Sequence, residues 1–340
     1  MYNAFFHLKQ NPFEVSPDPY FIYTTPWHGE AFASLYYGIR SHKGFMVLTG
    51  EVGTGKTLVL RCLTDHLDKL RIQYAYIFNP LLSSDEFLRY LSADLNLRLP
   101  MTGKHDILIQ LHAHLAQRQK IGQTTTLIVD EAHLLSLQLL EEIRLLGNLE
   151  NQQSKLLQIV LVGQPELDKR LDSPNLRQLK QRISLRCQLQ PLSLEQTGQY
   201  ITWRLKRAGV SGDDGPVFTP EAVAAVFEYS QGYPRLINTI CDNALIFACG
   251  AEARIVRLEL VVEACRDLHI KGWQPTTASP EEDADPHNPR YPAFPPTLRE
   301  IDQVLQHLRA LGSTANRPMV QGSANDNGHP SIIRASEVNS

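Results

Sequence analysis

The residues best suited to chemistry in this sequence form the stretch GEVGTGKT at positions 50–57. Its three glycines let the main chain turn sharply and bring several N–H groups to an anion at the positive end of a following helix. Lys56 would then reach the terminal phosphates, and Thr57 would offer its hydroxyl to Mg²⁺. The pattern predicts a nucleotide-binding loop made of Gly50, Glu51, Val52, Gly53, Thr54, Gly55, Lys56, Thr57 and Leu58.

A second candidate group, LIVDEAH at 127–133, supplies the carboxylates that this loop lacks. We expect Asp130 to hold the Mg²⁺ shell together with Thr57, and Glu131 to polarise an attacking water. A protein that only holds a nucleotide needs no general base beside the γ-phosphate, so Glu131 favours hydrolysis. We interpret His133 as a helix-start residue, because the chain is too short for the two motor domains of a helicase with the same letters.

Three further side chains are candidates for the same site. Gln164 ends the apolar run LVGQ, where we expect it to orient the water or to sense the γ-phosphate. Arg182 precedes the last predicted strand and is a candidate arginine finger for a neighbouring subunit's nucleotide, a role for which Arg177 and Arg186 compete. Arg235 lies at a helix start in GYPRLIN, from which it could touch the γ-phosphate.

Alternating apolar runs and helical patterns must position these residues. Apolar runs at 45–50, 72–79, 124–133, 156–167 and 184–192 predict five strands, and the segments between them have helical periodicity. This alternation predicts a parallel sheet with helices on both faces and a ligand site at the carboxyl ends of the strands. Beyond 193 only helical stretches follow, which predicts a small all-helical second domain.

Composition sets the broad class. The chain has 340 residues, of which 43% are hydrophobic and 20% charged, a globular balance. A formal charge of −3 gives no overall attraction to nucleic acid or to an anionic membrane. Its five cysteines are scattered without a C-x-x-C pair, so we expect reduced thiols. We see no signal peptide and no apolar run near the ~18 residues that span a bilayer. We therefore expect a cytoplasmic protein without direct membrane insertion.

The motifs resemble a known family. In this order, GEVGTGKT, LIVDEAH, LVGQPEL, LRQLKQRI and GYPRLIN resemble segments of the AAA+ ATPases of the general secretion pathway protein A (ExeA) family. Residues 1–39 also resemble that family's N-terminal segment, and the likeness extends to about residue 270. Similar ATPases serve pilus biogenesis and occur in exosortase and exopolysaccharide loci.

The resemblance implies more than the residues alone. It implies ATP as the nucleotide with Mg²⁺, a P-loop sheet of strand order 5-1-4-3-2, an adenine pocket between the N-terminal segment and the helical lid, and homo-oligomeric assembly into a ring or filament. By position it assigns Walker A to Lys56 and Thr57, Walker B to Asp130 and Glu131, sensor 1 to Gln164, the finger to Arg182 and sensor 2 to Arg235. The family's long form continues into a membrane span and a peptidoglycan-binding domain, so here a partner would supply the link to the inner membrane.

We divide the chain into six segments. They are an N-terminal segment that packs on the ATPase core (1–43), the AAA+ P-loop ATPase domain (44–192), the helical lid domain (193–272), a proline-rich acidic linker (273–296), an amphipathic helix (297–312) and a disordered tail (313–340). The amphipathic helix either docks on an envelope-assembly partner or folds back on its own domain.

Three functions remain open at this point. The first is a Mg²⁺-dependent ATPase that oligomerises on nucleotide and drives or organises a secretion, pilus or polysaccharide-export assembly. The second is a DNA-associated regulator of the transposition type, favoured only by the basic stretches LKQRISLR and WRLKRAG. The third is a nucleotide-gated scaffold with slow hydrolysis.

Overall fold

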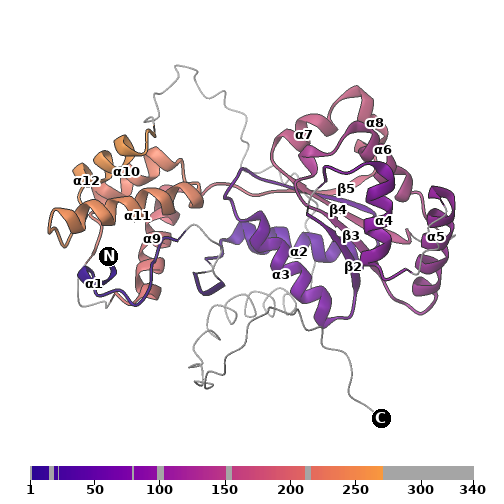
Figure 1. The fold of residues 1–340 in the computed structure, drawn as a ribbon, viewed down its shortest axis with the longest axis horizontal. Coiled ribbons are helices and arrows are strands. Elements are labelled where there is room, and N and C mark those ends of the chain that lie inside the picture. Colours follow the sequence, from indigo (N-terminus) through magenta and orange to yellow (C-terminus); the bar gives the residue numbers. More distant parts are fainter. Residues whose placement is uncertain are drawn as a thin grey trace, which may run out of the picture.

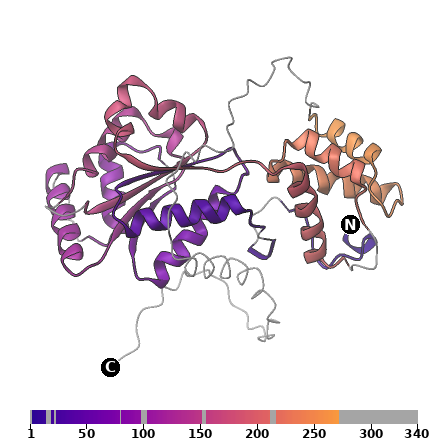
Figure 2. The same ribbon diagram turned by 180° about the vertical axis from the view of Figure 1, so that it is seen from behind.

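The computed structural model describes residues 2–14, 19–21, 23–78, 80–97, 103–150, 155–210 and 216–270. The predicted linker, amphipathic helix and tail lie outside the described residues. Within them the chain forms an α/β body and a helical body, which lie side by side in Figures 1 and 2.

The α/β body is built on a five-stranded parallel sheet of order β2-β3-β4-β1-β5. This order confirms the one that the resemblance implies. The parallel register aligns Thr49 of β1 with Gly163 of β4, so the segments that follow both strands leave the same edge of the sheet. The strands are β1 (Phe45–Thr49), β2 (Gln73–Ile77), β3 (Thr125–Val129), β4 (Leu157–Gly163) and β5 (Ile183–Gln188).

Helices cover both faces of this sheet, as the alternating pattern predicts. On one face α2 (Pro26–Arg40) and α3 (Lys56–Lys69) pack against alternate residues of the strands. The other face is covered by α4 (Ser84–Asp94), α5 (Lys104–Lys120), α6 (Leu137–Leu146), α7 (Glu166–Leu171) and α8 (Arg177–Lys180), with 3₁₀ turns η2 (Ala132–Leu134) and η3 (Pro174–Leu176) between them.

Local sequence explains where these elements begin and end. The central strands β1, β3 and β4 are buried along their whole length, which is why they read as continuous apolar runs. Ser83 and Ser136 cap α4 and α6 by accepting bonds from main-chain N–H groups, as serine does at a helix start. The short helices α7 and α8 have too few residues to show a helical period and escape prediction.

The helical body consists of α9 (Leu194–Ala208), α10 (Pro220–Ser230), α11 (Pro234–Gly250) and α12 (Leu258–Asp267) around a single apolar core. That core also takes in Tyr2, Phe6 and Phe13, so α1 (Tyr2–Phe5) and the residues after it pack on this body, as does the 3₁₀ turn η1 (Pro19–Phe21). The expectation that the whole N-terminal segment packs on the ATPase core is therefore wrong for these residues. Among the described residues of this segment, α2 is the part that packs on the sheet.

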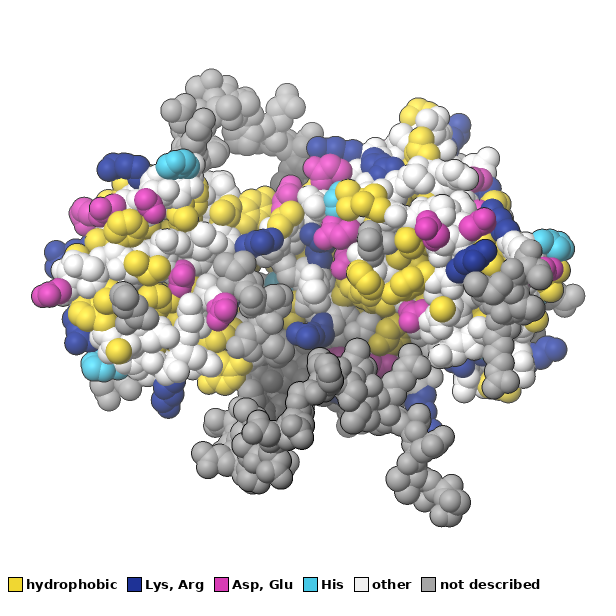
Figure 3. Space-filling model, viewed as in Figure 1, with side chains coloured by type: hydrophobic (Ala, Val, Ile, Leu, Met, Phe, Trp, Pro, Cys, Tyr) yellow, Lys and Arg dark blue, Asp and Glu magenta, His cyan; other side chains and the backbone are white. Residues whose placement is uncertain are grey.

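The surface and the helix lengths complete the description. On the face drawn in Figure 3, acidic and basic side chains are interspersed over both bodies. No helix among the described residues is both long and apolar enough to cross a membrane. All five cysteines are free thiols.

Candidate active site

The glycine-rich loop joins the end of β1 to the start of α3. Gly53 and Gly55 have φ of +83° and +97°, a left-handed conformation that favours glycine. Lys56 is only 8% exposed, and its Nζ donates hydrogen bonds to the main-chain oxygens of Gly50 (2.7 Å) and Glu51 (3.0 Å). Burial lowers the pKa of Lys56, while Glu131 and Asp130 nearby act in the opposite direction. The loop thus holds a buried ammonium group at the N-terminus of a helix.

The helical body touches this loop directly. A Cβ added to Gly53 would lie 2.6 Å from Cβ and 3.3 Å from the main-chain nitrogen of Arg235, so only glycine fits there. Arg235 is the second residue of α11, whose N-terminus therefore faces the loop. Its side chain is exposed and makes no hydrogen bond or ion pair with the rest of the described chain. The predicted sensor thus lies against the predicted phosphate loop.

A histidine that the sequence analysis missed supports the loop from the other side. His28 of α2 is buried, and its Nε2 lies 2.9 Å from the main-chain oxygen of Thr54. Its Nδ1 accepts from the main-chain N–H of Thr25 (3.1 Å), which leaves the ring proton on Nε2 to donate to Thr54. A Cβ on Gly55 would come within 2.4 Å of that ring nitrogen. Burial lowers the pKa of His28.

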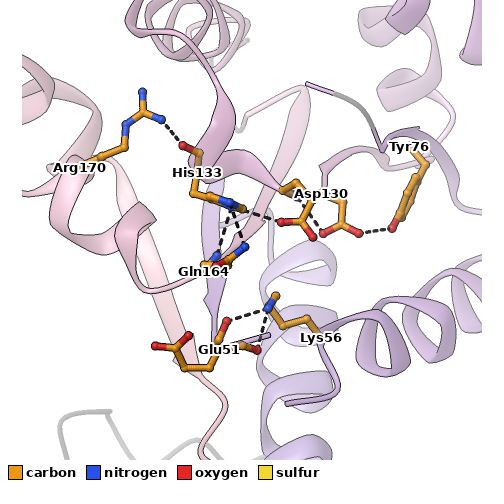
Figure 4. A network of polar contacts seen from close by, with 9 residues as sticks. Glu51, Lys56, Tyr76, Asp130, His133, Gln164 and Arg170 are labelled. Atoms are coloured by element: carbon orange, nitrogen blue, oxygen red, sulfur yellow. Dashed lines mark hydrogen bonds and ion pairs between the residues drawn. The ribbon is translucent and has the colours of Figure 1, made fainter. Parts of the chain in front are cut away.

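The two predicted acids follow β3, at the same edge of the sheet (Figure 4). Both oxygens of Asp130 are engaged: Oδ1 accepts from the main-chain N–H of Glu131 (2.9 Å) and Oδ2 from the hydroxyl of Tyr76 (2.9 Å). Tyr76 belongs to β2 and was not predicted as a site residue. Glu131 has φ of +50°, an uncommon conformation for a residue with a side chain. The Asp130 carboxylate therefore holds the turn that presents Glu131.

Gln164 lies beside these acids and contacts His133, to which the sequence analysis gave no catalytic role. Its side-chain nitrogen is 3.1 Å from Nε2 of His133, and its main-chain N–H is 3.5 Å from Nδ1. The same Nδ1 lies 3.3 Å from Oε2 of Glu131. Arg170 of α7 donates to the main-chain oxygens of His133 and Leu135 (Figure 4). Our interpretation of His133 as a helix-start residue accounts for its place in η2 but not for these contacts.

Thr57 and Asp130 are suited to bind a magnesium ion that is also coordinated by the phosphates of a nucleotide. Thr57 is exposed in the first turn of α3, and its hydroxyl bonds no other described residue. The Asp130 carboxylate retains lone pairs beyond its two hydrogen bonds. In the described ranges no group of three or more His, Cys, Asp or Glu side chains gathers as a metal site. Mg²⁺ typically binds with one or two protein ligands plus phosphates and water, and Thr57 and Asp130 could be those protein ligands.

The three candidate finger arginines differ in their surroundings. Arg186 pairs with Asp168 (2.8 Å) and approaches Asp172. Arg182 donates to the main-chain oxygen of Arg144 (3.0 Å) and to the side chain of Asn148, at the end of α6. Arg177 is exposed at the start of α8 and makes no hydrogen bond or ion pair with the described part of the chain. Arg182 thus lies at the end of α6, whereas Asp168, the partner of Arg186, accepts a hydrogen bond from Thr49 at the end of β1.

Comparison with known proteins identifies relatives of this chain. The model of an AAA domain matches residues 39–171. General secretion pathway protein A of Aeromonas hydrophila is 45% identical over 280 residues, which is 81% of this chain and 50% of that protein. The chain thus spans about half the length of this curated relative.

Solved structures share the fold at low identity. Drosophila ORC bound to DNA has a TM-score of 0.58 at 20% identity, and the match covers 79% of this chain and 66% of that one. Cdc6p from Pyrobaculum aerophilum has a TM-score of 0.54 at 19% identity, covering 78% and 70% of the two chains. These likenesses confirm the predicted P-loop AAA+ fold.

Proposed function

The chain belongs to the AAA+ proteins related to general secretion pathway protein A, and on that premise we propose that it hydrolyses ATP with Mg²⁺ and assembles into a homo-oligomer. One observation carries the proposal: Glu131 directly follows Asp130 at the end of β3, and among the carboxylates that oppose the fall in the pKa of the buried Lys56 ammonium it has the largest effect. A site for binding alone has no use for that carboxylate.

The reaction follows from the roles of these side chains. Glu131 takes a proton from water as the water oxygen bonds to the γ-phosphorus, and the bond from that phosphorus to the β,γ-bridging oxygen breaks, releasing ADP and phosphate. Lys56 and the loop N–H groups stabilise the negative charge on the phosphates. Gln164 orients the water, and Arg235 approaches the γ-phosphate from the helical body.

Thr57 and Asp130 are the residues that would hold Mg²⁺. The ion, when bound, neutralises charge on the phosphate oxygens. Tyr76 and the main-chain N–H of Glu131 orient the Asp130 carboxylate for this task.

We further propose that the assembly serves a cell-envelope machine. The support is the relationship to general secretion pathway protein A, whose name places it in a secretion pathway. A cytoplasmic chain would reach the inner membrane through a protein partner, with residues 297–312 as the candidate docking segment.

Arginines of the basic stretches that favoured DNA binding make contacts within the protein. Arg204 is 5% exposed and bonds Tyr200 and Asn238, and Arg207 lies over the rings of Tyr20 and Trp203. We therefore favour a protein partner. Capture from cells of the Glu131→Gln variant should recover envelope-assembly proteins. Recovery of DNA-associated proteins alone, with salt-sensitive duplex binding in vitro, would support the DNA-linked alternative instead.

The Glu131→Gln variant also tests the hydrolytic role. It keeps the size of the side chain but cannot take a proton, so we expect turnover to fall about 10²- to 10⁴-fold with ATP affinity retained. Glu259→Gln, in the exposed first turn of α12, is the matched control and should keep near wild-type turnover. Equal activity of the two variants would overturn the assignment of the base.

A further inference from the structure

We propose that His133 is a positioning residue that joins the sensor Gln164 to the general base Glu131. The inference rests on the proposed ATPase function and adds a residue to which the sequence analysis gave no catalytic role. His133 occupies η2, two residues beyond the base, and its side chain is 11% exposed. Figure 4 shows the ring beside Gln164 and near the turn that carries Asp130.

The contacts run through both ring nitrogens. Nε2 lies 3.1 Å from the side-chain nitrogen of Gln164, and Nδ1 lies 3.3 Å from Oε2 of Glu131. That oxygen is buried and lacks a hydrogen bond of good geometry within the described chain, although the Glu131 side chain as a whole is 43% exposed. The imidazole thus faces the one carboxylate oxygen that water does not reach, and the exposed remainder of the side chain is left for the attacking water.

The proposed relay uses one tautomer of the ring. With the side-chain nitrogen of Gln164 donating to Nε2, the ring proton resides on Nδ1, facing Glu131, and the main-chain N–H of Gln164 makes no bond to the ring. The other tautomer would let Nδ1 accept from the Gln164 main chain at 3.5 Å, but it would set two N–H donors against each other at Nε2. The relay therefore runs from the Gln164 amide to the imidazole and from the imidazole to the Glu131 carboxylate.

A second set of contacts holds the ring in place. Arg170 donates to the main-chain oxygens of His133 and Leu135, so α7 fixes the η2 turn. Gln164 lies two residues before the start of that helix. A shift of Gln164 towards a phosphate would consequently move the imidazole and, through it, the base. Contacts between catalytic groups commonly shorten when substrate binds, which agrees with the 3.3 Å separation here.

Three substitutions of His133 separate positioning from mere packing. His133→Ala removes the donor to Glu131, and we expect a fall in kcat of about 10²-fold with little change in KM or ATP affinity, the scale expected for a misplaced catalytic group. His133→Asn places an amide N–H near the position of Nδ1 and should restore at least tenfold of that loss. His133→Gln extends its amide towards the position of Nε2 and should not.

A double-variant cycle tests the relay itself. If Gln164 acts partly through His133, then Gln164→Ala should lower kcat much less in the His133→Ala background than in the wild type. Full additivity, or equal kcat for the Asn, Gln and Ala variants, would overturn the proposal. Wild type and Glu131→Gln are measured alongside. Lack of turnover in the wild type would refute the proposed function instead, and thermal unfolding identifies any variant that fails to fold.

Discussion

The Walker B turn places unusual demands on its residues. Glu131 adopts a left-handed conformation that costs an ordinary residue roughly 1–2 kcal/mol, and the Asp130 side chain offsets part of this cost by accepting its N–H. Asp130 therefore has two uses, as a candidate metal ligand and as the cap of the turn. Its replacement by alanine would disturb both, so an inactive variant at this position is a less specific test than Glu131→Gln.

His28 provides a prediction about pH. Burial lowers the pKa of His28 below the ordinary value of 6.5, so at mildly acidic pH this side chain binds a proton in the unfolded chain but not in the folded chain. The resulting loss of stability begins as pH falls through 6.5 and continues down to the lowered pKa, with a slope of up to about 1.4 kcal/mol per pH unit. The free energy of unfolding should therefore fall more steeply with decreasing pH in the wild type than in His28→Gln.

Denaturant titrations between neutral and mildly acidic pH measure this difference. His105→Gln, an exposed position on α5, is the control and should follow the wild-type curve. Parallel curves for the wild type and His28→Gln would contradict a neutral, buried His28.

Residues in local motifs were predictable, and those held by distant elements were not. Lys56, Thr57, Asp130 and Glu131 could be assigned because a loop or strand end carries each motif within one short stretch. His28 and Tyr76 could not, because the groups that they bond, Thr54 and Asp130, lie 26 and 54 residues further along the chain. No periodicity or residue spacing in the sequence indicates such distant pairs.

At the scale of elements, the contact between the glycine loop and α11 is directly testable. Alanine at Gly53 would place a methyl group against Arg235 and would force a left-handed conformation on a residue with a side chain. We expect Gly53→Ala to weaken ATP binding at least tenfold by separating α11 from the loop. Titration with a fluorescent ATP analogue measures this effect.

Gly122 supplies a matched control. It has a similar φ of +72°, but an added Cβ would meet no atom within 4 Å. Gly122→Ala should therefore lose about 1–2 kcal/mol of stability from the backbone alone while binding ATP normally. Equal ATP affinities for the two alanine variants would show that the approach of Arg235 to the loop is irrelevant to binding.

The strand β2 makes its own contribution through Tyr76. Tyr76→Phe removes the hydroxyl that orients the Asp130 carboxylate, and we expect the Mg²⁺ concentration for half-maximal turnover to rise about tenfold. Tyr74→Phe, on the same strand, loses only a bond to Asp68 of α3 and should leave the Mg²⁺ requirement unchanged. An unchanged Mg²⁺ requirement in both variants would remove Tyr76 from the site.

Elements were easier to predict than their partners. The five strands and the longer helices follow from apolar period and capping serines. The attachment of residues 2–13 to the helical body could not be predicted in this way, since an aromatic segment before a helix can pack on either body. Arg204 of α9 attaches this segment to the helical body. It donates to the main-chain oxygen of Pro12 and lies 4.8 Å from the Phe21 ring centroid.

At the scale of the whole molecule, the N-terminal segment connects the two bodies. Its first residues belong to the core of the helical body, and α2 holds the glycine loop through His28. The loop therefore receives contacts from both α2 and α11. A change in the position of the helical body would therefore act on the loop through both α2 and α11, which suits the nucleotide-dependent assembly that we propose.

The most direct test of a hydrolytic site shared between subunits is ATP turnover per subunit as a function of protein concentration, for the wild type and for Arg177→Ala and Arg182→Ala. We predict that wild-type turnover per subunit rises with concentration, and that one of the two variants stays inactive at every concentration while still binding ATP. Turnover that is independent of concentration and unaffected by either substitution would contradict the account, because each chain would then hydrolyse ATP alone.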